Sequence, residues 1–94
     1  TKVRGMFVHP RQVDEAVSRF AGEVDAARLV VTREEGADKM TLEVRLKPGV
    51  QETDVLRDSL TERVREATKM RGDVVFVADI PGNSRKIEDR RKWE

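Results

Sequence analysis

Near the start of the chain, apolar side chains recur with the period of a helix, at Val13, Ala16, Val17, Phe20 and Ala21. The spacing i, i+3, i+4, i+7 and i+8 places them on one stripe, which predicts an amphipathic helix. Pro10 stands where a first helical turn tolerates proline, and Gly22 is expected to end the helix.

The period then changes to that of strands. Residues 26–32 are mostly apolar or β-branched, and within residues 40–47 the apolar side chains alternate strictly with polar ones. This pattern predicts two strands, the second of them half-buried. The polar stretch 34–38 contains Gly36, so we expect the two strands to form a hairpin.

The second half of the chain repeats the order of helix and strand. After Pro48 and Gly49 break the pattern, apolar side chains recur at i, i+4, i+8 and i+11, namely Leu56, Leu60, Val64 and Ala67. They predict a second amphipathic helix. Residues 74–78 are apolar on both faces, which predicts a strand that is covered on both sides or placed centrally.

With a short apolar strand at residues 4–9, the order becomes β-α-β-β-α-β with a C-terminal extension. This order predicts an α+β domain of the ferredoxin-like kind, with two helices on one face of a small antiparallel sheet. The 94 residues suit a single domain with one core, and the sequence shows no internal repeat or linker.

Composition excludes several classes of function. Lys and Arg number 19 against 18 Asp and Glu, so there is no field that would favour nucleic acid. The chain has no Cys and a single His, His9, so a disulfide, a thiolate site or a zinc site is not expected, and we predict no metal in this chain. Three Phe and one Trp are too few for an RNA-stacking surface. No apolar stretch approaches the roughly 20 residues of a membrane span, so the expected setting is cytoplasmic.

Two motifs stand at the ends of the chain. Residues 4–10 read Arg-Gly-Met-Phe-Val-His-Pro, and residues 82–91 read Gly-Asn-Ser-Arg-Lys-Ile-Glu-Asp-Arg-Arg. An Arg-Gly pair leading into a strand that ends in Pro, with a distant Gly-plus-basic loop and Asp-x-Arg, resembles the C-terminal domain of phenylacetate-CoA ligases. These are acyl-adenylate-forming, AMP-binding enzymes, and the resemblance spans essentially the whole chain.

The resemblance implies that residues 1–94 are the mobile C-terminal domain of a larger ligase, and the start at Thr1, directly on a strand, fits an excised domain. Its partner would be the N-terminal adenylation domain of the same polypeptide. ATP and CoA would be substrates of the full-length enzyme, with Mg²⁺ accompanying ATP outside this chain, and the chain alone is expected to be inactive. An aryl acid plus ATP would give an acyl-adenylate, and CoA would then displace AMP after the domain rotates.

The opening loop, which we define as Arg4, Gly5 and Met6, would bind CoA on this reading. A glycine lets a ligand approach the backbone closely, and in the resembled ligases the matching loop lines the pantetheine tunnel. Arg4 would face a phosphate or the partner domain. The alternatives are a bulge at Gly5 and a solvated cation at Arg4. The chain departs from the family at Phe7, where Asn is usual, and at His9, where an aromatic is usual; we interpret His9 as a capping or surface residue.

The closing segment, residues 82–91, would serve the adenylation step. A flexible cation between a carboxylate and the α-phosphate lowers the barrier to joining them, and Lys suits that role. Strict register places Asn83 where many members carry this lysine, so Lys86 is the candidate, being the only Lys between Lys69 and Lys92. The alternative is that the basic residues of this segment form a solvated tail. Trp93 is expected to pack against this domain or its partner.

Two other functions fit the same sequence. A deazaflavin-coenzyme synthetase related to these ligases would use such a domain for adenylyl transfer. A stand-alone ferredoxin-like regulatory or interaction domain would instead form a homodimer through an exposed sheet edge. The identity of the acid belongs to the absent domain, so phenylacetate is a family label.

Overall fold

The computed structural model describes residues 2–3, 6–80 and 87–90. Within these ranges the chain forms two α-helices, one 3₁₀ turn and six strands: β1 (Lys2–Val3), β2 (Met6–Phe7), α1 (Pro10–Val17), η1 (Ser18–Phe20), β3 (Val24–Glu34), β4 (Ala37–Leu46), α2 (Asp54–Thr68), β5 (Asp73–Phe76) and β6 (Ile87–Asp89). Both predicted helices and the predicted hairpin are confirmed, each with bounds within a few residues of the expected ones.

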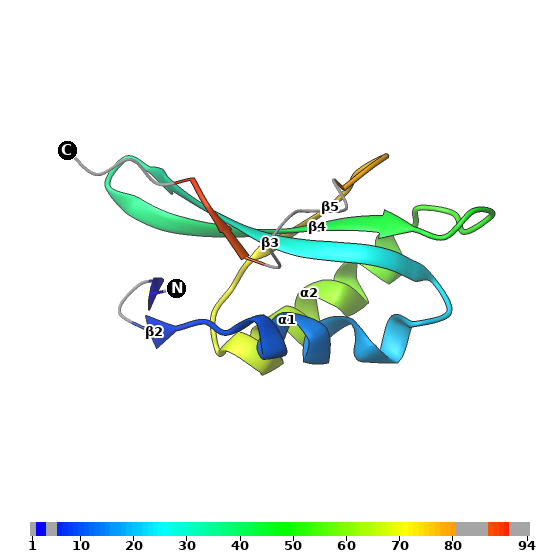
Figure 1. Ribbon diagram of the computed structural model, residues 1–94, viewed down its shortest axis with the longest axis horizontal. Helices are drawn as coiled ribbons and strands as arrows, with labels where there is room; N and C mark the ends of the chain where they lie inside the picture. Colours follow the sequence, from blue (N-terminus) through cyan, green and yellow to red (C-terminus); the bar gives the residue numbers. More distant parts are fainter. Residues whose placement is uncertain (1, 4–5, 81–86, 91–94) are drawn as a thin grey trace.

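The molecule has two layers (Figure 1). Strands β3 to β6 form a sheet in the order β5-β4-β3-β6, and both helices cover the same face of it. The predicted α+β architecture, with two helices on one face of a small sheet, is therefore confirmed. We call the opposite face of this sheet the outer face.

The sheet is mixed, so the prediction of an antiparallel sheet was wrong in this respect. β3 and β4 pair antiparallel, whereas β5 is parallel to β4 and β6 is parallel to β3. A helix between two neighbouring strands returns the chain to its starting end, and α2 therefore makes β5 parallel to β4.

Two further expectations about strands also need correction. The first strand does not join the main sheet: β1 and β2 pair only with each other, and β6 occupies the edge beside β3. The apolar run at residues 74–78 is not central, because β5 lies at the other edge. Val75 there is 40% exposed, since it points to the outer face, where no helix covers it.

Local chemistry explains where the regular elements begin and end. The β3–β4 hairpin turns at Glu35 and Gly36, both with positive φ (51° and 80°), as a two-residue primed turn requires. The Oγ1 atom of Thr53 accepts a hydrogen bond from the amide of Leu56 at 3.1 Å and caps the start of α2. Lys69, with φ of 63°, ends that helix in the left-handed conformation.

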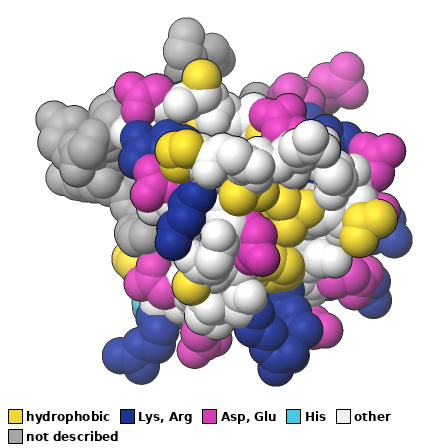
Figure 2. All heavy atoms as spheres, turned by 90° about the vertical axis from the view of Figure 1, so that its right-hand side faces the viewer, with side chains coloured by type: hydrophobic (Ala, Val, Ile, Leu, Met, Phe, Trp, Pro, Cys, Tyr) yellow, Lys and Arg dark blue, Asp and Glu magenta, His cyan; other side chains and the backbone are white. Residues whose placement is uncertain are grey.

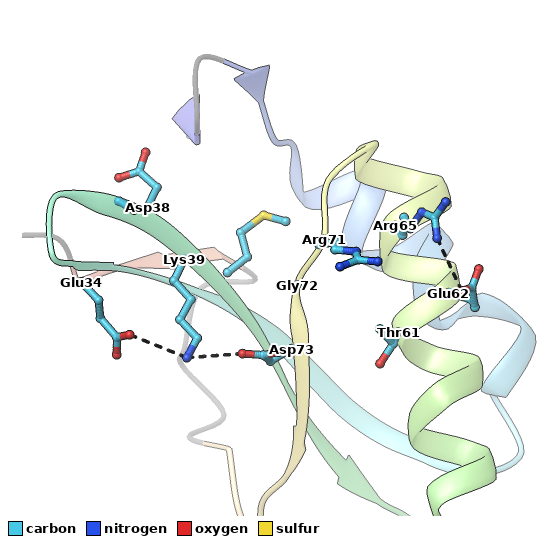
Figure 3. A pocket seen from close by; sticks show the side chains of 11 residues that line it. Glu34, Asp38, Lys39, Thr61, Glu62, Arg65, Arg71, Gly72 and Asp73 are labelled. Carbon is cyan, nitrogen blue, oxygen red and sulfur yellow. Dashed lines mark ion pairs between the residues drawn. The ribbon is translucent and has the colours of Figure 1, made fainter.

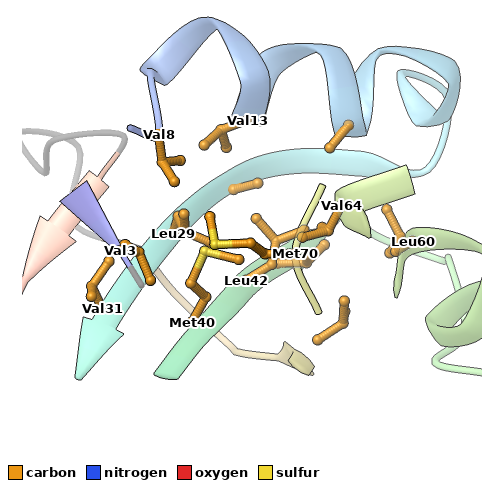
Figure 4. Close-up of a cluster of buried hydrophobic side chains, with 14 residues drawn as sticks. Val3, Val8, Val13, Leu29, Val31, Met40, Leu42, Leu60, Val64 and Met70 are labelled. Carbon is orange, nitrogen blue, oxygen red and sulfur yellow. The ribbon is translucent and has the colours of Figure 1, made fainter. Parts of the chain in front are cut away.

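The hydrophobic core lies between the helices and the sheet (Figure 4). Leu29, Leu42 and Leu60 are at most 1% exposed and come from β3, β4 and α2 respectively. Val3 and Val8, from the segment around β1 and β2, are fully buried in the same cluster. The N-terminal segment is thus held by the core although it is outside the main sheet.

Candidate functional site

The opening loop is bordered by a paired and buried segment. Lys2 pairs with Phe7 and Val3 with Met6, so Arg4 and Gly5 are the two residues between the paired strands. Arg4 and Gly5 lie outside the described residues, whereas the backbone of Met6 belongs to β2. Because Val3 is fully buried, the base of this loop is attached to the helix-side core.

The closing segment is described only at its end. Lys86, like Asn83 and Arg85, lies outside the described residues, and so does Trp93. Strand β6 follows directly, and the amide of Arg90 donates to the carbonyl oxygen of Val31 at 2.8 Å. The position that the sequence assigns to the adenylation lysine is therefore adjacent to a strand joined to β3.

The chain that enters this region is also attached to the sheet. The amide of Val77 donates to the carbonyl oxygen of Val44 at 2.9 Å. Ile80 is 7% exposed and does not belong to the helix-side core cluster. Residues 81–86 are thus bordered on both sides by backbone that bonds to the central hairpin.

His9 lies at the N-cap of α1 and is exposed. Its amide donates to Oε1 of Gln12 at 2.8 Å, and the amide of Gln12 donates to the carbonyl oxygen of His9 at 2.9 Å. This reciprocal pair stabilises the first turn of the helix. The interpretation of His9 as a capping or surface residue is confirmed, since its backbone forms the cap and the residue is exposed.

The outer face of the sheet carries ion pairs that the sequence reasoning missed. Arg45 contacts Asp25 at 2.7 Å and Asp79 at 2.8 Å. The hydrogen bond to Asp79, followed by that to Asp25, raises the pKa of Arg45 above its ordinary value. The sequence signal that could have indicated these ion pairs is the alternation in β4, where every second residue is polar and several of these residues are charged.

A second group of ion pairs lies nearby on the same face. Nε of Arg28 is 2.5 Å from Oε1 of Glu43, its direct partner across the β3–β4 ladder. The same guanidinium reaches Glu88 of β6 at 3.2 Å, and Arg90 also contacts Glu88 at 2.8 Å. Both groups of ion pairs therefore link the hairpin to the chain that borders residues 81–86.

A hollow of about 510 Å³ opens between α2 and the ends of β4 and β5 (Figure 3). Its charged lining mixes both signs: Glu34, Asp38, Glu62 and Asp73 with Lys39, Arg65 and Arg71. Nζ of Lys39 lies 3.9 Å from Oε2 of Glu34 and 3.4 Å from Oδ2 of Asp73. Because these charges largely offset one another, the hollow offers no net field to an anionic substrate, and we assign it no ligand.

The face of the molecule drawn in Figure 2 shows the same mixture. In Figure 2, hydrophobic side chains gather near the middle of one face, and acidic and basic side chains surround them. Among the described residues, no group of three His, Cys, Asp or Glu could hold a metal ion. No helix of the described chain is long and apolar enough to cross a lipid bilayer.

Comparisons with known proteins agree with this architecture. The sequence profile of the family described as AMP-binding enzyme C-terminal domain matches residues 5–91. A crystallised domain of phenylacetate-coenzyme A ligase from Bacteroides vulgatus ATCC 8482 is 19% identical, with a TM-score of 0.85 over 98% of this chain and 92% of that one. At this identity the likeness concerns the fold.

Two longer proteins contain a similar domain. A 2-hydroxyisobutyryl-CoA ligase, crystallised with its acyl-adenylate and CoA in the thioesterification state, is 25% identical with a TM-score of 0.81. The chain covers 97% of its own length there and 21% of that ligase. An acyl-CoA synthetase from Brucella canis is 24% identical, with a TM-score of 0.66, over 85% of this chain and 15% of that one. No curated protein sequence matches the chain.

Proposed function

Since the chain belongs to the family of AMP-binding enzyme C-terminal domains, we propose that it is the mobile C-terminal domain of an ATP-dependent acid-CoA ligase. The chain spans about a fifth of the 2-hydroxyisobutyryl-CoA ligase that contains a similar domain. The remaining part of such an enzyme, an N-terminal adenylation domain, would bind the acid and ATP. The substrate class that we propose is an aryl acid of the phenylacetate type.

The proposed reaction has two steps. In the first step a carboxylate oxygen of the acid attacks the α-phosphorus of ATP, and pyrophosphate leaves. In the second step the CoA thiol, having lost its proton, attacks the acyl carbon, and AMP leaves to give the thioester. This domain would present a different surface to the active site in each step.

Lys86 would act in the first step. The attacking carboxylate and the α-phosphate are both negative, and a compact ammonium on a flexible side chain stabilises the charge that develops as they join. The opening loop would act in the second step, because Gly5 leaves room for the pantetheine arm and Arg4 supplies a cation for a phosphate of CoA.

One observation carries the proposal: the chain beside the opening loop is buried in the helix-side core, whereas ion pairs beside the closing segment lie on the outer face of the sheet. Val3, which precedes Arg4, is buried in the helix-side core. Asp79 and Glu88, on either side of the stretch that contains Lys86, bind arginines of the outer face. A rigid domain whose two loops are attached through different contacts can present one loop and then the other by rotating as a body.

The test uses the full-length polypeptide that carries this domain and separates the two steps. ATP-pyrophosphate exchange measures adenylation, and thioester formation from supplied acyl-adenylate and CoA measures the second step. We expect Lys86→Ala to lower exchange by about 10²–10³-fold, the usual effect of removing one transition-state charge partner, and to leave the second step nearly unchanged. We expect Gly5→Trp to abolish the second step and to spare exchange.

Matched variants control for general damage. Lys47→Ala removes a lysine that is exposed on the described part of the domain, and Gly22→Trp places the same bulk at an exposed glycine with open space around it. Both should leave each step as in the parent. Intact exchange in Lys86→Ala would contradict the role of Lys86. Formation of an adenylylated product without thioester would instead favour the deazaflavin-coenzyme synthetase alternative, and no activity with any acid would favour the stand-alone domain.

A further inference from the structure

Two arginines of the central hairpin reach the chain on either side of residues 81–86. Arg45 of β4 contacts Asp79 at 2.8 Å, and Arg28 of β3 contacts Glu88 at 3.2 Å. Asp79 precedes this stretch and Glu88 follows it. Each end of the stretch is thus joined to the sheet by a guanidinium-carboxylate pair.

Each of these arginines is also held by a second carboxylate. Arg45 binds Asp25 at 2.7 Å, and Nε of Arg28 binds Glu43 at 2.5 Å. A planar guanidinium with one edge already bound has few orientations left for its other nitrogens. The hairpin therefore presents both guanidinium groups in a fixed direction toward Asp79 and Glu88.

The register of the strands places the two arginines close together. Arg28 lies opposite Glu43, and Arg45 lies opposite Ala26. Both therefore project from the outer face as diagonal neighbours, which in an antiparallel pair lie roughly 7–8 Å apart at the backbone.

Backbone bonds reinforce the same two attachments. The amide of Val77 donates to the carbonyl oxygen of Val44, and the amide of Arg90 donates to that of Val31, at 2.9 and 2.8 Å. Val44 adjoins Arg45 in β4, so the backbone bond and the ion pair at Asp79 act on neighbouring positions.

We propose that Arg45 and Arg28 are positioning residues for the adenylation step. They fix the two ends between which Lys86 lies and so determine where its ammonium group can reach. Neither arginine would touch the acid, ATP or CoA. This inference rests on the proposed function of Lys86, and its structural part, the attachment of both ends, is independent of that function.

Asp79 and Glu88, the acids that bind Arg45 and Arg28, can be replaced without unfolding the domain. The side chain of Asp79 is 79% exposed and that of Glu88 is 39% exposed. Exposed ion pairs contribute little to global stability, so Asp79→Ala and Glu88→Ala should fold. Removing the acids also leaves the pairs of Arg45 with Asp25 and of Arg28 with Glu43 in place. Asp58→Ala, at an exposed acid on α2, is the control.

The first measurement is amide hydrogen exchange in the 94-residue chain, resolved by NMR. We expect Asp79→Ala to speed exchange of the Val77 amide roughly fivefold, and Glu88→Ala to do the same for the Arg90 amide. The amide of Leu60 in α2 should exchange as in the parent, which excludes global unfolding. Unchanged exchange rates of the Val77 and Arg90 amides would contradict the proposal that the ion pairs attach these segments to the hairpin.

The second measurement uses the two half-reactions of the full-length polypeptide. We expect each acid variant to lower kcat of pyrophosphate exchange about tenfold, because small displacements of a positioned group are costly, with KM for ATP nearly unchanged. Thioester formation from supplied acyl-adenylate should be unaffected, and Asp79→Glu should restore part of the exchange rate. Equal loss in both half-reactions, or no loss in either, would overturn the positioning role.

The two measurements separate this inference from the proposed function. Faster amide hydrogen exchange in the acid variants, together with normal pyrophosphate exchange in Lys86→Ala, would reject the proposed role of Lys86. The attachment of residues 81–86 to the hairpin at both ends would still hold. Unchanged amide hydrogen exchange in the acid variants would reject the attachment by ion pairs, even if Lys86→Ala abolishes pyrophosphate exchange.

Discussion

Gln12 of α1 and Ala67 of α2 join the two helices, because Nε2 of Gln12 donates to the carbonyl oxygen of Ala67 at 3.0 Å. That carbonyl belongs to the last turn of α2, where the backbone lacks its helical donors. Oε1 of the same Gln12 accepts the amide of His9 at 2.8 Å. One side chain thus completes the start of one helix and the end of the other.

We expect Gln12→Met to lower the free energy of unfolding by about 1–2 kcal/mol, since it removes a helix cap and leaves a half-buried carbonyl without its donor. Urea denaturation measures the loss. Arg11→Met is the control, because Arg11 is exposed at the neighbouring position of the same helix. Equal midpoints for the two variants would show that Gln12 does not join the helices energetically.

Thr68 is the buried polar side chain at the end of α2, 3% exposed. Its hydroxyl donates to the carbonyl oxygen of Val64 at 2.7 Å and accepts the amide of Met70 at 3.2 Å. Thr68→Val keeps the shape and leaves the Met70 amide unpaired, so we expect a loss of about 1–3 kcal/mol in denaturant titration. Thr68→Ser keeps the hydroxyl and should lose clearly less; a larger loss in Thr68→Ser would contradict this account.

Glu35 occupies the first position of the β3–β4 turn with φ of 51°, a conformation that asparagine adopts more readily than glutamate. We expect Glu35→Asn to raise the free energy of unfolding by about 0.5–1 kcal/mol, measured by thermal and urea denaturation. Gly36→Ala, at φ of 80° in the same turn, should change stability in the opposite direction by about 1 kcal/mol. A stabilising Gly36→Ala would exclude the primed turn.

Leu60 is fully buried between α2 and the sheet. Truncating such a side chain removes its transfer free energy and leaves a cavity, so we expect Leu60→Ala to cost about 2–5 kcal/mol. Val55 lies on the same helix and is 77% exposed, and Val55→Ala should change stability by less than about 0.5 kcal/mol. Calorimetry measures the melting temperatures of both variants. An equal fall in the two would contradict the assignment of Leu60, and not Val55, to the core between α2 and the sheet.

Asn83 and Lys86 provide a test of the register of the closing segment. Asn83 stands where strict register expects the family lysine. If Lys86 performs the adenylation role, Asn83→Lys in the Lys86→Ala background should restore less than about a tenth of the lost pyrophosphate exchange, because the ammonium then starts three residues away. Full restoration would move the catalytic position to residue 83. Asn83→Lys in the parent serves as the control for the added charge.

The sequence alone determined both helices and the hairpin between β3 and β4. Their signals are local: the spacing of Leu56, Leu60 and Val64 marks one face of a helix, and Gly36 supplies the positive φ of the turn. Burial of one face is enough to specify each of these elements before any partner is known. The motifs at the chain ends also sufficed to predict the family, which the match over residues 5–91 confirms.

Most of the candidate residues within those motifs lie where the structure describes only their neighbours. Met6 belongs to β2, whereas Arg4, Gly5 and Lys86 lie outside the described residues and their roles stay predictions. The structure adds the contacts of the residues beside each motif. Val3 is buried in the helix-side core, and Asp79 and Glu88 bind arginines on the outer face.

Only the tertiary structure decided which strands are neighbours. β5 became an edge strand parallel to β4, β6 took the place beside β3, and β1 paired with β2 alone. It also brought Arg45 to Asp79, 34 positions away in the chain. Period and composition report which face of a segment is buried, but the choice of neighbour depends on how connections such as α2 return the chain across the sheet. That choice is a long-range property, and it is made by the packing of the whole domain.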